Sequence, residues 1–322
     1  MKAWVLTVAV LLSLAPMARA QDDSLRYKWA EGLGASYTLA FTSSGKMTAR
    51  NETRAWKAAW TAEVNVSIES ANAQGVADVR FKLGPMKGKQ TVVGKGDTTF
   101  DIDPEAAKAV VTQDGGDPMT LELTDDAKRA LAAGFTATMD DRGNVMSMEG
   151  NEQIDLFMMG LQSMAGLPDM IGIVKVMFPI LPDQPMAEGG KWEQVSSFPM
   201  LREKLGVKVK FAWKRLEDAE VGGKSCVRLG MSAKVANRAE KIAAAANGGM
   251  AVEYSGLSMN ADGTLALSEV DTLPVAAKYS MTQPGKMTLH AVGTEKGLGG
   301  EQNVDETMAM EGCASTAEVT RQ

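Results

Sequence analysis

Few residues of this chain have the types and spacing that catalysis needs. His290 is the only histidine, and it lies between Leu289 and Ala291 on the polar face of an alternating segment. A catalytic base needs a nucleophile and an orienting carboxylate beside it, and no Gly-x-Ser-x-Gly sequence supplies that nucleophile. We therefore expect His290 to be a solvated residue without a catalytic role.

Two lysine motifs resemble catalytic loops. Ser43-Ser44-Gly45-Lys46 has the spacing of a Ser/Lys acyl-enzyme motif but lacks the companion Lys-Thr-Gly sequence. Gly223-Lys224-Ser225 resembles the end of a phosphate-binding loop, but Asp218 stands where the first glycine belongs. Turn chemistry explains both motifs better than catalysis does.

Paired acids occur at Asp101 and Asp103, at Asp125 and Asp126, and at Asp140 and Asp141. Two carboxylates in one cleft would suit a glycosidase, but each pair falls at an expected helix start or hairpin turn, where Asp has a capping role. One histidine and two distant cysteines leave no zinc constellation. We expect no metal, no cofactor and no enzymatic activity.

Residues 1–20 have the layout of a secretory signal peptide. A basic start is followed by an apolar run, and Ala18-Arg19-Ala20 provides small residues before a cut at Gln21. The sequence thus predicts an exported protein, in the periplasm or the extracellular medium. No later apolar run reaches the length of a membrane-spanning helix, so we expect no transmembrane segment after cleavage.

The charge balance excludes some partners. The chain has 34 basic and 40 acidic residues, a net charge of −6, and no basic tract. Nucleic acids and anionic membranes need clustered positive charge, so neither is an expected partner. An apolar ligand or a protein of the cell envelope fits the composition better.

Cys226 and Cys313 are the only cysteines. An oxidising compartment and an even count favour a disulfide, whereas two free thiols are the alternative. The sequence does not decide whether the two sites meet.

Alternation with a period of two recurs along the whole chain and predicts antiparallel hairpins. The expected hairpins pair 63–69 with 78–83, 207–214 with 227–235, 257–259 with 265–267, and 275–281 with 287–289, and one more is centred on 139–145. The expected fold class is α+β, predominantly antiparallel β, with a curved sheet or partial barrel covered by short helices.

The expected helices cover 104–111, 125–133 and 239–246, and two further, apolar helices are expected within 151–178. Asp103 and Thr124 are plausible caps, and Gly134 is a plausible stop. The second apolar helix, after Asp169, is apolar nearly all round, with Lys175 as its only charge after the cap. Such a helix is buried or lies in an interface.

A proline-rich connector divides the chain near residue 185. We expect an N-terminal β-rich half over 21–184, which ends in the apolar helices, and a C-terminal antiparallel β half over 185–322. The segments 42–48 and 282–288 resemble each other, and both read as strand, turn and strand. They mark either a duplicated unit or a chance likeness.

Three stretches together carry a family resemblance. They are Met139–Val145 with the helix after it, Leu181-Pro182-Asp183-Gln184-Pro185 continuing to Gly190-Lys191-Trp192, and Asp262-Gly263 between two strands. In this order they resemble an exported bacterial family labelled as a domain of unknown function, in which Asp often stands where Gly190 does. The resemblance implies a β-rich exported protein and no catalytic residue. By analogy of fold alone, the β-rich pattern is also similar to the curved sheets of periplasmic lipoprotein carriers.

The Met-rich block from Ile154 to Leu181 is the strongest candidate for function. Unbranched, polarisable Met side chains adapt to varied apolar ligands, so two such helices would form a lid over a cavity. The alternative is that they only cover the core. The candidate lid residues are Phe157, Met158, Leu161, Met164, Met170, Ile173 and Met177.

Three functions remain open at this point. The first is a non-enzymatic structural or interaction module of the cell envelope, which would bind through its surface. The second is a periplasmic carrier that holds a lipid or another apolar ligand under the Met-rich helices. A hydrolase with dispersed carboxylates is the least favoured, because it needs a polar cleft with converging acids.

Overall fold

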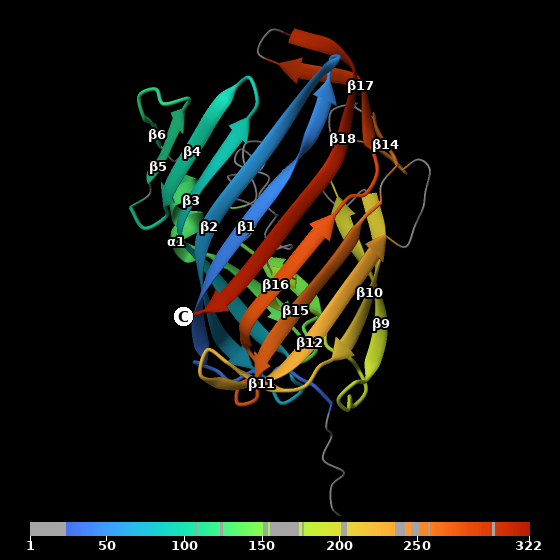
Figure 1. The fold of residues 1–322 in the computed structure, drawn as a ribbon. Coiled ribbons are helices and arrows are strands. Elements are labelled where there is room, and N and C mark those ends of the chain that lie inside the picture. Colours follow the sequence, from blue (N-terminus) through green and yellow to red (C-terminus); the bar gives the residue numbers. More distant parts are fainter. Residues whose placement is uncertain are drawn as a thin grey trace, which may run out of the picture.

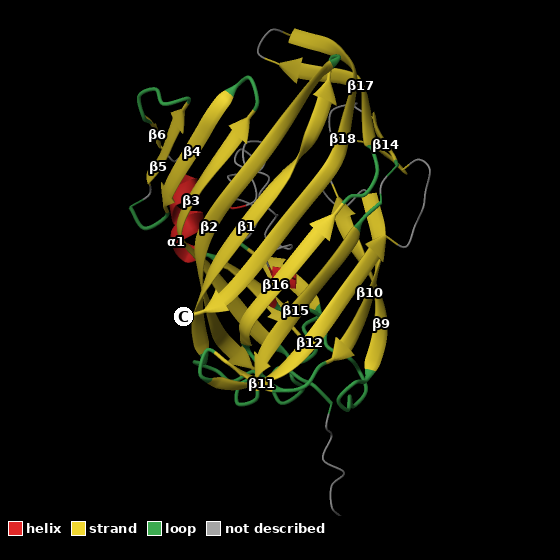
Figure 2. Cartoon of the chain, viewed as in Figure 1, coloured by secondary structure: helices red, strands yellow, loops and turns green. Residues whose placement is uncertain are grey.

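The computed structural model describes residues 24–106, 108–122, 125–150, 154, 174–175, 177–200, 205–235, 242–245, 251–256, 258–297 and 300–322. Within them one large, curved, antiparallel sheet of 18 strands dominates, and helix is scarce (Figure 1, Figure 2). The expected curved, mainly antiparallel sheet is confirmed, while a covering of short helices is only weakly supported.

Four long strands form the centre of the sheet, in the order β18, β1, β2, β3. They are Gly34–Ala49 (β1), Glu52–Ala71 (β2), Ala77–Val92 (β3) and Gly300–Arg321 (β18). A two-residue turn joins β1 to β2, with Arg50 at φ 50° and Asn51 at φ 65°. Positive φ at both positions matches the right-handed twist of the flanking strands.

The sheet divides on both sides of this centre. One edge of β3 pairs with β7 along 77–81 and with β4 along 86–92. One edge of β18 likewise pairs with β16 along 314–320 and with β17 along 300–310. Two arms therefore leave each side, and the longest runs β16, β15, β12, β10, β9.

The arms beside β3 consist of Gly96–Asp103 (β4), Lys108–Gln113 (β5), Met119–Glu122 (β6), Phe135–Met139 (β7) and Val145–Glu149 (β8), with the helix Asp125–Ala133 (α1). The arms beside β18 consist of Lys191–Met200 (β9), Leu205–Arg215 (β10), Ala219–Val221 (β11), Lys224–Val235 (β12), Ile242–Ala245 (β13), Ala251–Ser255 (β14), Asn260–Ser268 (β15), Pro274–Thr282 (β16) and Met287–Gly297 (β17).

The side chains of the central strands alternate between a buried inner face and an exposed outer face. In β2 every second residue from Ala58 to Ile68 is buried, and the residues between them are exposed. Below the inner face, Tyr27 stacks on Trp29 with ring centroids 4.9 Å apart and meets Phe178 edge-on at 5.6 Å. These rings close one end of the core, where Phe81 stacks on Phe135.

Several local predictions are confirmed. The 63–69 and 78–83 segments pair as β2 and β3, and Asn72 Oδ1 accepts hydrogen bonds from the backbone N–H of Gln74 and Val76 in the turn. The 207–214 and 227–235 segments pair as β10 and β12. The hairpin around 139–145 forms between β7 and β8. Helix α1 begins and ends where its cap and stop signals predict, with Gly134 at φ 73°.

Two helix predictions are wrong where the structure describes them. Over 104–111 the chain makes a turn and then β5, and Asp103 Oδ1 accepts hydrogen bonds from the N–H of Glu105 and Ala106. The capping signal is therefore real, but it forms a turn between two strands. Within 239–246 the described residues 242–245 form β13.

Three turn predictions are also wrong. Asn260-Ala261-Asp262-Gly263 lies inside β15, which pairs along its length with β12 and β16. β16 and β17 do not form a hairpin, because both pair with β18. The 42–48 segment continues through β1 without a turn. Between Ser44 and Lys46 of β1 the register shifts, because β18 has one extra residue opposite them. Its likeness to 282–288 therefore does not extend to structure.

Cys226 and Cys313 are free, so the disulfide alternative is not realised. The strand register places the two cysteines far apart. Arg228, two residues after Cys226, lies in the same cross-strand row as Thr320. Thr320 is seven residues beyond Cys313 on β18. At about 3.3 Å per residue the two cysteines differ in level by more than about 20 Å, whereas a disulfide needs Cα atoms within about 7 Å.

The expected signal peptide lies outside the described residues, so export stays a prediction. The division of the chain near residue 185 also stays a prediction. The pairing of β1 with β18 places strands from both expected halves in one sheet.

Candidate ligand-binding site

One row of directly paired residues crosses the inner face of the sheet from β9 to β5. We call it the aromatic row. Its members, in spatial order, are Trp192, Trp213, Met231, Gly263, Tyr279, Ala317, Phe41, Trp60, Gly88, Phe100 and Val111.

Two glycines make space for the rings of this row. A Cβ on Gly88 would lie 2.2 Å from Cζ of Phe100, and one on Gly263 would lie 2.4 Å from Cδ1 of Tyr279. The rings of Phe41 and Trp60 stack at 5.3 Å, and those of Trp192 and Trp213 stack at 5.6 Å with planes 10° apart. The row thus carries two pairs of stacked rings, and its two glycines leave space for the rings of Phe100 and Tyr279.

Every side chain in the row that can form a hydrogen bond has a buried polar atom without a partner. These atoms are Nε1 of Trp60, Trp192 and Trp213, and Oη of Tyr279. Buried Trp and Tyr usually find partners, and each unpaired group costs about 1–3 kcal/mol. Four such groups therefore lie in one row of the inner face.

Two other aromatic side chains of the same core, Trp29 and Tyr27, are paired. Nε1 of Trp29 donates to the backbone oxygen of Asp140 at 3.0 Å, and Oη of Tyr27 donates to that of Pro179 at 2.8 Å. The unpaired groups are therefore concentrated in the aromatic row but are not confined to it, because Oη of the fully buried Tyr37 also has no partner.

The row contains no Asp, Glu, Lys, Arg or His. Burial raises the pKa of Tyr279, so its phenol is neutral at pH 7. Arg215 lies at the end of the next row, where its Nη2 contacts Asp218 at 2.8 Å. A ligand on the aromatic row would accordingly meet dipoles and rings but no unpaired charge from the row itself.

Apart from Arg215 at its end, the next row on this side is a sealed apolar layer. Its apolar members are 0–5% exposed: Leu229, Leu265, Ala277, Val319, Leu39, Ala62, Met86, Ile102 and Ala109. On the other side lies Ser43, 9% exposed, whose Oγ also has no partner. The aromatic row thus marks the boundary between the closed core and a more polar part of the inner face.

Of the seven expected lid residues, only Met177 is described. It is fully buried, and so are Ile154 and Val174, in the same core as Trp60 and Trp213. Phe157, Met158, Leu161, Met164, Met170 and Ile173 lie outside the described residues. The lid therefore stays a prediction.

The sequence contains a partial signal for the aromatic row. Trp213, Met231 and Tyr279 each appear on the apolar side of an alternating segment. Their meeting in one row depends on the register between strands, which alternation alone does not supply. Gly263 was assigned to a turn for the same reason.

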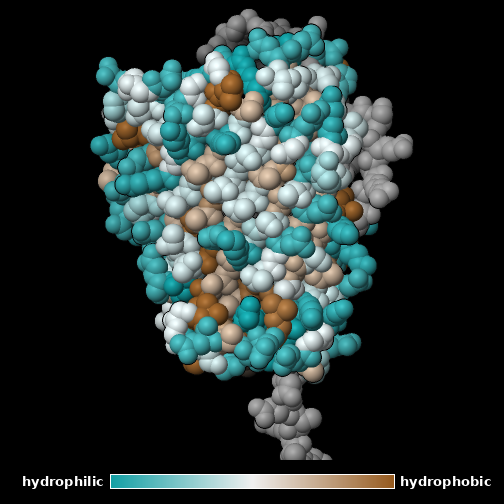
Figure 3. Space-filling view, viewed as in Figure 1, coloured by the Kyte–Doolittle hydropathy of each residue, from teal (hydrophilic) through white to brown (hydrophobic). Residues whose placement is uncertain are grey.

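The outer face offers a different kind of surface. A shallow hollow of about 680 Å³ lies over β10, β12, β15 and β16. Its lining includes Trp213, Met231 and Gly263 of the aromatic row, together with Leu216, small residues, and the charged Lys191, Lys214, Asp262 and Lys278. Figure 3 shows the outer face as mainly hydrophilic and small residues around scattered apolar ones. This hollow has the alternating charges of a solvated sheet face, so it is not the candidate site.

The described residues contain neither a membrane-spanning helix nor a cluster of metal-ligating His, Cys, Asp or Glu side chains. None of the helices there is long and apolar enough to cross a membrane. No group of three or more His, Cys, Asp or Glu side chains is placed there to hold a metal ion.

Comparison with known proteins identifies no family. No family model matches the chain, and no curated protein matches it.

Solved structures give only distant likenesses. Lipovitellin, from a study of lipid–protein interactions, is 7% identical with a TM-score of 0.44; the match covers 91% of this chain, which spans only 25% of lipovitellin. A DUF1329 family protein from Desulfovibrio piger is 10% identical, with a TM-score of 0.15 and coverage of 90% and 84%. A putative outer membrane lipoprotein-sorting protein domain from Vibrio parahaemolyticus is 10% identical, with a TM-score of 0.14 and coverage of 89% and 86%. These values establish no relationship, so the function is inferred from the chain's own residues.

Proposed function

We propose that this chain is an exported, non-enzymatic binding protein that holds a largely apolar, uncharged ligand against the aromatic row. The observation that carries the proposal is the set of four unpaired buried polar groups in the aromatic row. Apolar walls with a few fixed polar groups are typical of small-molecule sites. In a structural module with a solid core, these unpaired groups would only lower the stability of the fold. We therefore favour the carrier over the envelope module.

The unpaired groups define the chemistry of the ligand. An indole N–H only donates, so Trp60, Trp192 and Trp213 need acceptors on the ligand. The row provides no cation that would hold a carboxylate or a phosphate. An apolar chain with ester, ether or amide oxygens fits these requirements, and a fatty acyl ester is the simplest example.

The spacing of the donors favours a long ligand. Trp60 on β2 and Trp213 on β10 are separated by β1, β18, β16, β15 and β12. With strands about 4.8 Å apart, the path along the sheet is about 29 Å, which is longer than a single 16-carbon chain. Tyr279 lies at the middle strand of this path, so several acyl groups or one extended molecule would contact all the donors.

Binding of methyl palmitate and of palmitate, two ligands with the same chain, tests the proposal. Native mass spectrometry of the purified protein, with tryptophan fluorescence, measures both affinities. We expect the ester to bind and the acid to bind at least tenfold more weakly. If neither ligand binds, the carrier function is wrong; if the acid binds better, the neutral ligand class is wrong.

Substitution of single tryptophans locates the site. Trp60→Phe and Trp213→Phe keep a ring and remove the N–H, so each is expected to weaken ester binding about fivefold to tenfold. Trp29→Phe is the matched control, because that N–H already bonds to Asp140. Equal effects of all three substitutions would place the ligand elsewhere.

A further inference from the structure

A second cluster on the inner face is built from sulfur. Met287, Met310 and Met47 pair directly across β17, β18 and β1. Paired residues on one face have Cβ atoms about 4.5–5.5 Å apart, and the flexible Met side chain spans such gaps. Three thioethers can therefore converge above Met310, the central member.

A free thiol lies next to this row. Gly312, at φ 58°, forms the bulge of β18 and turns Cys313 toward Gly45. A Cβ on Gly45 would lie 2.9 Å from Sγ of Cys313 and 3.1 Å from Nε1 of Trp56. The thiol and the indole thus share one point on the inner face, one row away from Met47.

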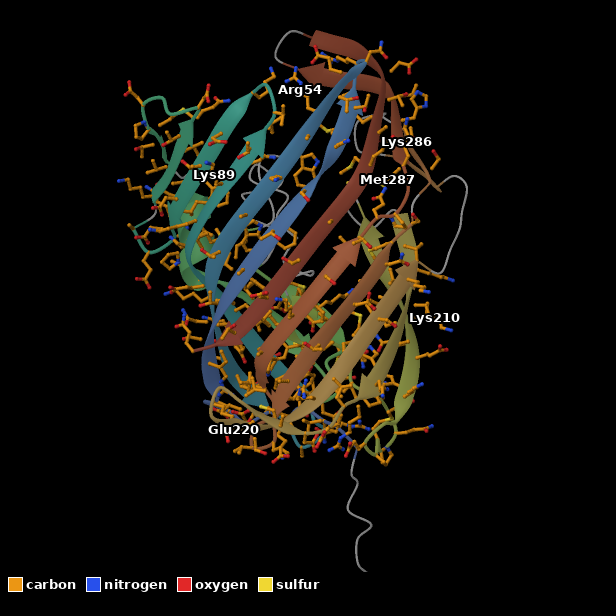
Figure 4. The ribbon with its side chains drawn as sticks, in the orientation of Figure 1. Arg54, Lys89, Lys210, Glu220, Lys286 and Met287 are labelled. Atoms are coloured by element: carbon orange, nitrogen blue, oxygen red, sulfur yellow. The ribbon has the colours of Figure 1, made fainter. Side chains whose placement is uncertain are left out.

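Exposure leaves this cluster accessible from one side. Met47 is 37% exposed, Met310 and Cys313 are partly exposed, and Met287 is 8% exposed. Figure 4 labels Met287 and Arg54 toward the end of the sheet where the β1–β2 hairpin turns. Arg54, the neighbour of Met47 in the row, is paired with Glu52, so its charge is already compensated.

We propose that Met47, Met287, Met310 and Cys313 form a binding site for a soft monovalent metal ion, Cu(I) or Ag(I). Thioether and thiolate ligands select soft ions over Mg²⁺ or Ca²⁺. Binding releases one proton from Cys313, because the thiolate is the ligand. The amino-acid sequence predicts no metal site here, because the three Met residues lie far apart in the chain and meet only through strand register.

Titration of the full chain with Ag(I), in chloride-free buffer, tests this site by calorimetry and native mass spectrometry. We expect one tightly bound ion and a change in Trp56 emission. Met310→Leu conserves volume and is expected to weaken this binding at least tenfold. Cys313→Ser is expected to weaken it and to abolish the proton release.

Met146→Leu is the matched control, because Met146 is 65% exposed on another arm of the sheet. Melting temperatures of all variants show whether each one is folded. The proposal is overturned if folded Met310→Leu keeps the Ag(I) affinity, or if Met146→Leu lowers it equally. The proposal is also overturned if Zn(II) displaces Ag(I) from the site at equal concentration.

Discussion

The ring of Phe100 lies directly over Gly88 on the neighbouring strand, where a Cβ would approach Cζ to within 2.2 Å. The same point is 2.7 Å from Cβ of Trp60. Gly88 therefore sets how closely the rings on β2 and β4 approach each other. The packing of the rings of Phe100 and Trp60 depends on this contact.

Gly88→Ala tests this dependence. The added methyl group has no space, so Phe100 must leave its rotamer or the two strands must separate. Such overpacking costs about 1–3 kcal/mol. We expect a lower free energy of unfolding in urea, and weaker ester binding because the ring beside Trp60 moves.

Gly230→Ala is the control for the effect of glycine in a strand. Gly230 lies within β12, and the three atoms nearest to a Cβ there all belong to Leu216, at 3.5–3.7 Å. This contact is ordinary, and Ala lowers the entropy of the unfolded chain. Gly230→Ala should be neutral or slightly stabilising; a loss equal to that of Gly88→Ala would contradict the packing argument.

Asp140 organises the β7–β8 hairpin. Its Oδ1 accepts hydrogen bonds from the N–H of Arg142 at 3.0 Å and of Asn144 at 2.8 Å, and its Oδ2 accepts one from Nδ2 of Asn144 at 2.7 Å. Asp140→Ala leaves these donors without an acceptor and should cost about 1–2 kcal/mol in urea unfolding. Asp117→Ala, at an exposed loop position, should change the stability by less than about 0.5 kcal/mol.

The sequence predicted correctly those elements whose boundaries depend on neighbouring residues alone. Helix α1 needed only a cap, a short helical stretch and Gly134. The same kind of signal at Asp103 was misread, because an Asp that bonds two following N–H groups serves a turn as well as a helix. Asp262-Gly263 was misread because a turn sequence can also lie in a strand that is paired on both sides.

The candidate sites depend on information that no single segment contains. Trp213 and Trp60 belong to one row only because several strands between them keep their register. Met287 and Met47 come together because β17 and β1 pair with opposite edges of β18. A sequence pattern with period two gives the face of each residue but not its partner.

Asp271 and Arg321 form a largely buried ion pair that makes stability depend on pH. Nη1 of Arg321 lies 2.8 Å from Oδ2 of Asp271, and the side chains are 10% and 16% exposed. Burial acts to raise the pKa of Asp271, but the bonds from Arg321 and from the N–H of Leu273 outweigh it and lower the pKa. This stabilisation is therefore complete above the unfolded pKa of about 3.9 and is lost as the pH falls through the folded pKa.

Asp271→Asn should cost about 3 kcal/mol at pH 7, because it leaves Arg321 unpaired. The deficit should begin to shrink as the pH falls below about 3.9, where the unfolded carboxyl takes up a proton, and should disappear through the lower folded pKa, where the folded carboxyl also becomes neutral. Urea unfolding between pH 7 and pH 2 measures both effects. Asp101→Asn, which removes an exposed pair with Lys87, should cost less than about 1 kcal/mol; a constant deficit for Asp271→Asn at every pH would refute the linkage.

The two thiols should differ in reactivity and should not depend on reductant. Cys226 is fully buried and Cys313 only partly, so iodoacetamide should label Cys313 first, as peptide mass spectrometry will show. Burial raises the pKa of both thiols, so labelling should be slow at pH 7 and faster as the pH rises and thiolate forms. Because the thiols are not bridged, dithiothreitol should leave the melting temperature unchanged; a drop of several degrees would mean that the protein forms a disulfide and that the strands carrying the cysteines are arranged differently.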